Sequence, residues 1–343
     1  MTNEIKTTIS VDELITGYRV NGGFKAIPSF PLNITAKSSE LIALIGANGS
    51  GKTTLLRTIA GLHPVKSGNI NICGLSPLKA NRLEFAKCLS IATTELLKIA
   101  YTSVTEFVLL GRYPYSNFFG KVNAKDLEIV NMAIEETGIS FKKNEQMNHL
   151  SDGERQRAVI ARTLAQDTQV ILFDEPTAFL DIRNKFEILN LLKTLTSKFG
   201  KTIIFSTHDL TAALHLADKI WMITSDCLIC KIPEQLIFDG DLAQEFNSDY
   251  LQIDKSSGNF NFIYKFYLHI GLSGGDGALY NMTANALKRI GFEVTSNKNT
   301  TSNVIIELKN NSYIWKLIQE NEIFVFNYLE DLILHLKIIK QKT

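Results

Sequence analysis

Gly46-Ala47-Asn48-Gly49-Ser50-Gly51-Lys52-Thr53 is the stretch that decides the fold of this chain. It follows an apolar run at residues 41–45 and precedes a segment with helical character, the setting that the phosphate-binding loop G-x-x-x-x-G-K-[ST] requires. The glycines let the backbone wrap closely, so that its N–H groups converge on an anion. Lys52 supplies a positive charge for the β- and γ-phosphates, and the Thr53 hydroxyl is placed to hold Mg²⁺. The stretch therefore predicts a strand–loop–helix unit that binds a nucleotide.

The composition is that of a globular chain with no strong charge. Its 343 residues, 45% of them hydrophobic, are enough for one large domain and a small one. Lys and Arg (36) nearly balance Asp and Glu (35), which gives no electrostatic case for nucleic-acid binding. No apolar run approaches the ~18 residues that span a bilayer, and no secretory signal opens the chain. We therefore expect a protein of the cytosol or of the cytosolic face of a membrane.

The four cysteines do not indicate a disulfide framework in a chain of this size. Cys227 and Cys230 form a C-x-x-C, but the surrounding residues have the pattern of a strand. Because positions three apart in a strand point to opposite faces, we expect no shared metal and no redox role for this pair.

Polar groups follow two predicted buried strands. Residues 170–173 form one such strand, and Asp174 and Glu175 come directly after it, at the edge where α/β sheets place their ligands. Two acids at the tip of a core strand are costly unless a cation or a water uses them. Residues 202–206 form the next strand, and His208 follows its end as a candidate phosphate contact.

Two further features allow more than one interpretation. Ser151 is a good N-cap for a predicted helix, and Glu154 completes a capping box, which on its own is a common structural device. Tyr18 lies in predicted antiparallel strand material ahead of the phosphate loop. It is either an aromatic that stacks on adenine or an ordinary strand residue.

Taken together, the motifs resemble those of the ABC ATPase family. Five segments within residues 5–250 come in the family's order and approximate spacing. They are the phosphate loop and residues 150–156, 173–177, 180–181 and 206–209. The resemblance implies an α/β P-loop NTPase with a mixed core sheet, an antiparallel β subdomain and a helical subdomain at about residues 96–165. Within the family, residues 110–114 (LGRYP) resemble a motif of ATPases that serve iron–siderophore, haem and vitamin B12 importers.

The resemblance also implies roles for individual residues and the cofactors ATP and Mg²⁺. Glu175 is implied as the general base or polarising group for the attacking water, with His208 on the γ-phosphate and Lys52 on the phosphates. Ser151 and Gly153 are implied to reach ATP bound to a second copy, and Asp181 to lie where two copies meet. The expected nucleotide contacts are Tyr18, Gly46, Ala47, Asn48, Gly49, Ser50, Gly51, Lys52, Thr53, Thr54, Glu95, Ser151, Gly153 and Asp181. The expected metal-site residues are Thr53, Asp174 and Glu95.

Two residues depart from the family pattern. Asp152 stands where the family usually has glycine, and its carboxylate would repel a γ-phosphate unless it turns away. Glu95 stands where the family has glutamine; it can still accept from water and ligate Mg²⁺, but it cannot donate as an amide does.

Residues 251–343 lie outside the family core and have the pattern of a small α/β domain, with 1–250 as the ATP-binding domain. We expect a strand at residues 262–270, a glycine-rich stretch at 271–277 and a helix at 278–290. The glycines do not reproduce G-x-G-x-x-G, so the stretch is either a ligand site or a plain strand-to-helix turn or dimer contact.

The resemblance implies the ATP-hydrolysing subunit of an importer, with a metal chelate or a corrinoid as solute. The expected partners are a second copy in head-to-tail arrangement, integral membrane permease subunits and, indirectly, a solute-binding protein, with no nucleic acid. The expected location is peripheral, on the cytoplasmic face of the inner (plasma) membrane. The alternatives are a soluble ABC ATPase acting on nucleic acid or the ribosome, and the ATPase of an exporter.

Overall fold

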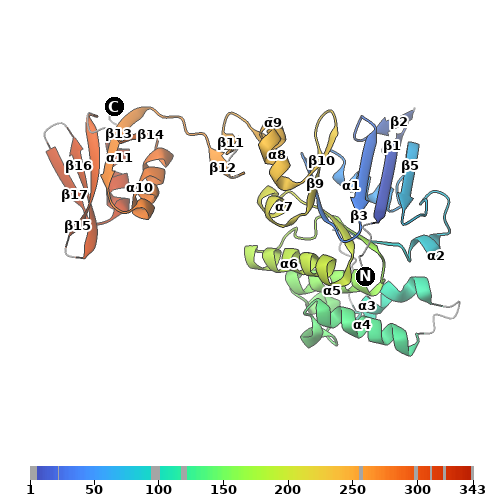
Figure 1. The fold of residues 1–343 in the computed structure, drawn as a ribbon. Coiled ribbons are helices and arrows are strands. Elements are labelled where there is room, and N and C mark those ends of the chain that lie inside the picture. Colours follow the sequence, from blue (N-terminus) through green and yellow to red (C-terminus); the bar gives the residue numbers. More distant parts are fainter. Residues whose placement is uncertain are drawn as a thin grey trace. The chain divides into compact units, whose positions relative to one another are not determined.

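The computed structural model describes residues 6–21, 23–93, 101–116, 122–254, 258–296, 300–309, 311–319 and 322–340 (Figure 1). Its contacts divide the chain into two compact units. The first comprises Met1–Glu245 with Lys255–Asn259, and the second comprises Phe246–Asp254 with Phe260–Thr343. Each unit has its own apolar core, and the two cores share no residue.

A six-stranded mixed sheet forms the centre of the first unit, in the order β10-β9-β4-β8-β7-β6. All neighbours in it are parallel except β10, which is antiparallel to β9. The strands are β4 (Leu41–Gly46), β6 (Leu89–Ala92), β7 (Val170–Phe173), β8 (Thr202–Ser206), β9 (Lys219–Ile223) and β10 (Leu228–Lys231). β4, β7 and β8 are buried at every residue, as continuous apolar strands of a sheet covered on both faces are. The predicted mixed core sheet is therefore confirmed.

An antiparallel sheet makes up the predicted β subdomain. In it β1 (Thr7–Val20) pairs with β2 (Gly23–Ala26), β3 (Leu32–Lys37) and β5 (Val65–Ile72). β3 alternates buried and exposed residues, the pattern of a strand with one face on a core. That core is shared with the central sheet and with α1 (Lys52–Ile59), so this sheet supports the strand and helix on either side of the phosphate loop.

Helices make up the rest of the first unit. α3 (Val104–Leu109), α4 (Ala124–Glu136) and α5 (Asp152–Ala165) pack on one another and form the predicted helical subdomain, together with the 3₁₀ turns η1 (Leu110–Tyr115), η2 (Ser140–Lys142) and η3 (Met147–His149). The remaining helices are α2 (Arg82–Phe85), α6 (Ile182–Phe199), α7 (Leu210–Leu216), α8 (Pro233–Asp239) and α9 (Asp241–Phe246).

A buried ion pair fixes the LGRYP segment within these helices. The Arg112 Nε atom lies 2.9 Å from Oδ1 of Asp126 in α4, and Nη1 donates to the Ala165 carbonyl at the end of α5, also at 2.9 Å. The Tyr115 ring covers the guanidinium, with its centroid 3.9 Å from Cζ. Removing one partner of such a buried pair typically costs about 3–5 kcal/mol, because the other charge is left unpaired. Arg112 therefore locks η1 onto α4 and α5.

The second unit contains a five-stranded sheet in the order β14-β13-β15-β16-β17 and a separate hairpin of β11 (Leu251–Ile253) and β12 (Phe260–Phe262). The sheet consists of β13 (Leu268–Gly274), β14 (Phe292–Thr295), β15 (Ser302–Lys309), β16 (Ser312–Gln319) and β17 (Glu322–Phe326). α10 (Gly277–Arg289) and α11 (Leu329–Lys340) pack their apolar residues into its core. None of the helices in the described part of the chain is both long and apolar enough to cross a membrane.

Two expectations for this unit need correction or refinement. The single strand expected at residues 262–270 is wrong, because β12 ends at Phe262 and β13 begins at Leu268. The glycine-rich stretch is a strand-to-helix turn: Gly274 and Gly275 adopt φ of 81° and 74°. A Cβ at Gly274 would lie 2.1 Å from the Ile306 carbonyl oxygen. The carboxylate of Asp276 caps the first turn of α10, so it already occupies the place that an anionic ligand would take.

Candidate nucleotide site

The phosphate loop connects β4 to α1 through backbone that only glycine tolerates. Gly46, Gly49 and Gly51 adopt φ of 150°, 80° and 104°. A Cβ at Gly46 would lie 2.6 Å from the Ile223 carbonyl oxygen, and one at Gly51 would lie 2.9 Å from Cγ2 of Ile27. Because Gly51 caps α1 without a side chain, the first-turn N–H groups of α1 stay available for an anion.

Lys52 lies over the loop that precedes it. Its Nζ atom donates to the carbonyl oxygens of Gly46 and Ala47, at 2.8 and 3.1 Å. Burial lowers the pKa of this ammonium from its usual value, while the nearby carboxylates of Glu175 and Asp174 oppose that shift. Among the described residues, the hydrogen-bond partners of Lys52 Nζ are these two carbonyl oxygens. A buried cation with such partners is held ready for a stronger acceptor, such as a phosphate oxygen.

A hydrogen-bond network links the loop to the ends of β7 and β8. Thr53 Oγ1 donates to Oδ1 of Asp174 at 3.1 Å, and the Ser206 hydroxyl donates to the same oxygen at 2.7 Å. Ser206 also accepts from the backbone N–H of Glu175 at 2.8 Å. Ser206 was not among the predicted site residues; the available signal was a polar residue at the last position of a buried strand beside Asp174. The network holds the Thr53 hydroxyl and a carboxylate together as oxygen ligands.

Glu175 and His208 meet across the same two strand ends. Nε2 of His208 lies 2.5 Å from Oε1 of Glu175, and both side chains are partly exposed. Glu175 has φ of 50°, in the left-handed region that a non-glycine residue adopts only when its surroundings impose it. This backbone turn and the His208 contact fix where the Glu175 carboxylate points.

These groups line one cavity of about 330 Å³. The predicted residues in its wall are Tyr18, Asn48, Gly49, Gly51, Lys52, Thr53, Thr54, Glu175 and His208. Ile27, which sequence reasoning missed, also lines it. The Tyr18 hydroxyl lies 3.0 Å from Oγ1 of Thr54, and its ring makes an edge contact with His63 at 4.9 Å between centroids. Tyr18 is therefore fixed at the cavity while 39% of its surface stays exposed.

The donor set of this cavity fits a nucleotide and a hard cation. Within the described part of the chain, the buried Ser50 hydroxyl has no hydrogen-bond partner, so it remains available to donate to an anion. Ala47 and Ser50 line an adjacent cavity together with Asn48 and Gly49. The oxygen atoms of Thr53 and Asp174 are the ligand type that Mg²⁺ takes. Glu95, expected at the same site, lies outside the described residues.

Three other predicted residues gather at a second place, outside the cavity wall. Ser151 caps α5 and forms the predicted capping box with Glu154, whose pKa is lowered by the hydrogen bond from the Ser151 backbone. Asp181 caps α6 and accepts from the Asn184 backbone at 2.8 Å. A Cβ at Gly153 would lie 2.8 Å from Oδ1 of Asn184, so the starts of α5 and α6 lie side by side.

Asp152, the residue that departs from the family pattern, pairs within its own helix. Its Oδ1 atom lies 3.1 Å from Nη1 of Arg155, and the carboxylate side chain is 64% exposed. The Arg155 guanidinium therefore offsets part of the carboxylate's charge, and the Asp152 side chain lies along α5.

Comparison with known proteins finds similarity in both units. Residues 30–178 match the family described as ABC transporter, and residues 268–337 match the family described as iron ABC transporter C-terminal domain. The petrobactin import ATP-binding protein FpuC of Bacillus anthracis is 40% identical over 189 residues, which cover 55% of this chain and 70% of that protein. The probable siderophore transport system ATP-binding protein YusV of Bacillus subtilis is 34% identical over 247 residues, covering 72% and 88%.

A solved structure has the same fold. It is a metal-chelate type ABC transporter in an inward-facing conformation, which matches with a TM-score of 0.62 and 24% identity. The match covers 75% of this chain and 97% of that one.

Proposed function

The chain belongs to the ATP-binding subunits of ABC transporters, and from this premise we propose that it hydrolyses ATP to drive the import of a ferric siderophore through a separate permease. The observation that carries the proposal is the single cavity in which Lys52, Thr53, Glu175 and His208 meet. The Lys52 ammonium and the N–H groups of the loop suit a polyphosphate, and the nearby carboxylates suit a metal ion and a water.

We propose that the triphosphate lies on the loop between β4 and α1. The N–H groups of the loop and of the first turn of α1 bind its oxygens, and Lys52 moves from the loop carbonyls to the β- and γ-phosphates. Tyr18 stacks on the adenine ring, for which its partly exposed face is suited. Thr53 and Asp174 would hold Mg²⁺, which would neutralise phosphate charge when bound.

We propose that Glu175 polarises the attacking water. Its carboxylate accepts a hydrogen bond from the water, raises the electron density on the water oxygen and takes up the proton that is lost on attack. His208, 2.5 Å from that carboxylate, keeps it directed at the water and contacts the γ-phosphate. The left-handed backbone of Glu175 also directs the carboxylate, because it fixes the direction in which the side chain leaves the backbone.

We propose that the site is completed by a second copy of the chain. Ser151, Gly153 and Asp181 gather at the starts of α5 and α6 and do not line the cavity of their own copy. Beside them Phe179 is 90% exposed and Ile182 is 77% exposed, an apolar surface that suits a partner. In a head-to-tail pair, the start of each α5 would reach the ATP held by the other copy.

We propose that the helical subdomain binds the permease at the cytoplasmic face of the membrane. Tyr113 and Leu110, which share the 3₁₀ turn η1, are 73% and 52% exposed, and Tyr101 ahead of α3 is 87% exposed. The buried Arg112–Asp126 pair holds this surface rigidly on α4 and α5, as transmission of a movement requires. A solute-binding protein would contribute only through the permease.

The solute class is proposed from the two relatives described above, which are named for petrobactin import and siderophore transport. The test is uptake of radioactive iron, supplied on a siderophore, by cells that lack the gene. Uptake should be lost, should return with the wild-type chain and should stay lost with Glu175→Gln, while cobalamin uptake is unchanged. Unchanged iron uptake in cells that lack the gene would contradict the solute assignment.

A further inference from the structure

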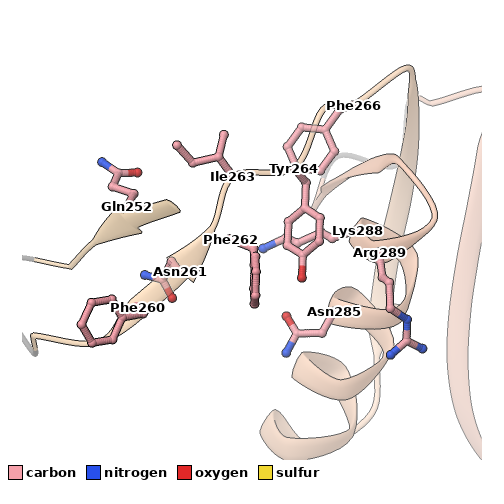
Figure 2. A pocket seen from close by; sticks show the side chains of 10 residues that line it. All are labelled: Gln252, Phe260, Asn261, Phe262, Ile263, Tyr264, Phe266, Asn285, Lys288 and Arg289. Carbon is pink, nitrogen blue, oxygen red and sulfur yellow. The ribbon is translucent and has the colours of Figure 1, made fainter. Parts of the chain in front are cut away.

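A separate cavity lies wholly within the second unit, between residues 260–266 and α10 (Figure 2). Its volume is about 620 Å³, within the ~300–1,000 Å³ of small-molecule sites. Among the described residues, its wall contains aromatic rings, amides, two cations and the aliphatic Ile263, and no acidic side chain.

The two cations are Lys288 and Arg289, in the last turn of α10. Within the described part of the chain neither side chain has an ion-pair partner, whereas Lys316 of the same unit pairs with Glu307. Cations at the end of a helix also interact favourably with its dipole. The dipole explains the position of these residues on the helix, but not the aromatic and amide wall that faces them.

The aromatic wall comes from an extended segment in which every second residue is an aromatic: Phe260, Phe262, Tyr264 and Phe266. The rings of Tyr264 and Phe266 lie with their centroids 6.4 Å apart. Phe262 is 72% exposed, and Figure 2 shows it with Tyr264 beside Asn285 and Lys288 of α10. A ring so exposed at a cavity gains free energy when a second ring covers it, because apolar surface is removed from water.

The amides are Gln252, Asn261 and Asn285. Their side chains have no hydrogen-bond partner among the residues that the structure describes, so their donor and acceptor groups remain available. Amides that surround a cavity can bind hydroxyl or carboxylate groups at the edge of a planar ligand.

We propose that this cavity binds a small anion that carries an aromatic ring. The ring stacks on Phe262 and Tyr264, the anionic group lies against Lys288 and Arg289, and the amides bind the polar edge. A bare inorganic anion would leave the rings uncovered, and a neutral aromatic compound would leave both cations without a partner. The proposal concerns binding alone and does not depend on the transport function.

Two sources share this chemistry: a hydroxylated aromatic acid, and a nucleotide with its base and phosphate. Isothermal titration of the full-length chain with 2,3-dihydroxybenzoate tests the first. Titration of AMP into the Lys52→Ala chain tests the second, since that change weakens the contribution of the phosphate loop. We expect one of these aromatic anions to bind, and catechol and inorganic phosphate to bind about tenfold or more weakly.

Variants then place the binding in this cavity. Lys288→Gln/Arg289→Gln should weaken it by about tenfold or more, and Phe262→Leu should weaken it severalfold without a change of charge. The control Lys309→Gln/Lys337→Gln removes the same charge from exposed positions of this unit outside the cavity and should leave binding unchanged. Thermal unfolding checks that each variant is folded. The proposal is overturned if neither aromatic anion binds at about 10 mM, or if binding survives both the charge and the ring changes.

Discussion

Nε2 of His208 lies 2.5 Å from Oε1 of Glu175, a contact that joins the carboxyl ends of the neighbouring strands β7 and β8. The contact joins the two side chains that the proposed chemistry needs near the γ-phosphate, the Glu175 carboxylate and the His208 imidazole. Glu175 already adopts a left-handed backbone conformation, so its carboxylate has two independent constraints. Loss of either should reduce catalysis more than ATP binding.

His208→Ala tests the histidine constraint. We expect kcat for ATP hydrolysis to fall by about 10²-fold or more, because Glu175 loses its orientation and the γ-phosphate loses a contact. ATP affinity should change much less, since the phosphate loop remains. The matched control is His215→Ala, an exposed histidine of α7 whose hydrogen-bond partner among the described residues is the Thr211 carbonyl of its own helix. Equal activity of the two variants would exclude a role for His208.

Ser151→Ala separates a structural cap from a functional one. Ser151 and Ser103 form the same capping box, with Glu154 and Glu106, so each change should cost about 1 kcal/mol of stability. Only Ser151→Ala should also lower ATP turnover, because only Ser151 is proposed to reach ATP on a second copy. Thermal unfolding and ATPase assays of both variants provide the comparison. An equal loss of turnover in Ser103→Ala would show that Ser151 acts only as a helix cap.

Asp152→Asn tests the departure from the family pattern. The carboxylate pairs with Arg155 at 3.1 Å, so we expect the ATP concentration for half-maximal turnover to change by less than about twofold. Asparagine keeps the shape and removes the charge. A large decrease in that concentration would show that the carboxylate leaves Arg155 and repels the γ-phosphate when ATP binds.

Lys52 gives ATP binding a dependence on pH. Burial lowers its pKa in the free protein, and a bound polyphosphate should raise it again. In the alkaline window between these two pKa values the complex holds more protons than the free protein, so binding takes up protons and affinity falls as pH rises. Titration calorimetry in buffers of different ionisation enthalpy measures the uptake. Lys52→Arg, which stays protonated, should abolish it; proton release by the wild-type chain would contradict the account.

The parts of the site that could be predicted are those that one short segment specifies. The glycines around Lys52, the acids after β7 and His208 after β8 each follow a local pattern. The structure brings Lys52, Glu175 and His208 to one cavity, and Asp174 bonds Thr53 in its wall. Ser206 could not be assigned in this way, because its role depends on the pairing of β7 with β8, in which Phe173 lies opposite Phe205.

Two other features depended on distant contacts in the same way. The LGRYP segment is fixed by Arg112, whose partners Asp126 and Ala165 lie 14 and 53 residues further along the chain. The strand expected at residues 262–270 failed for a related reason. Alternating aromatics are typical of a strand, but strand pairing needs a neighbouring backbone, and in this segment the pairing of β12 ends at Phe262.

The most direct test of the central claim, that this chain hydrolyses ATP with Glu175 acting on the water, is the behaviour of Glu175→Gln with ATP. The amide keeps the shape of the side chain and every contact of the phosphate loop, but it is a poor proton acceptor. Turnover and size-exclusion elution should be measured on the same purified sample, with and without ATP. The account predicts turnover reduced by about 10²-fold or more and a two-copy species that forms only with ATP. Hydrolysis at the wild-type rate, or a chain that stays a single copy with ATP bound, would contradict it.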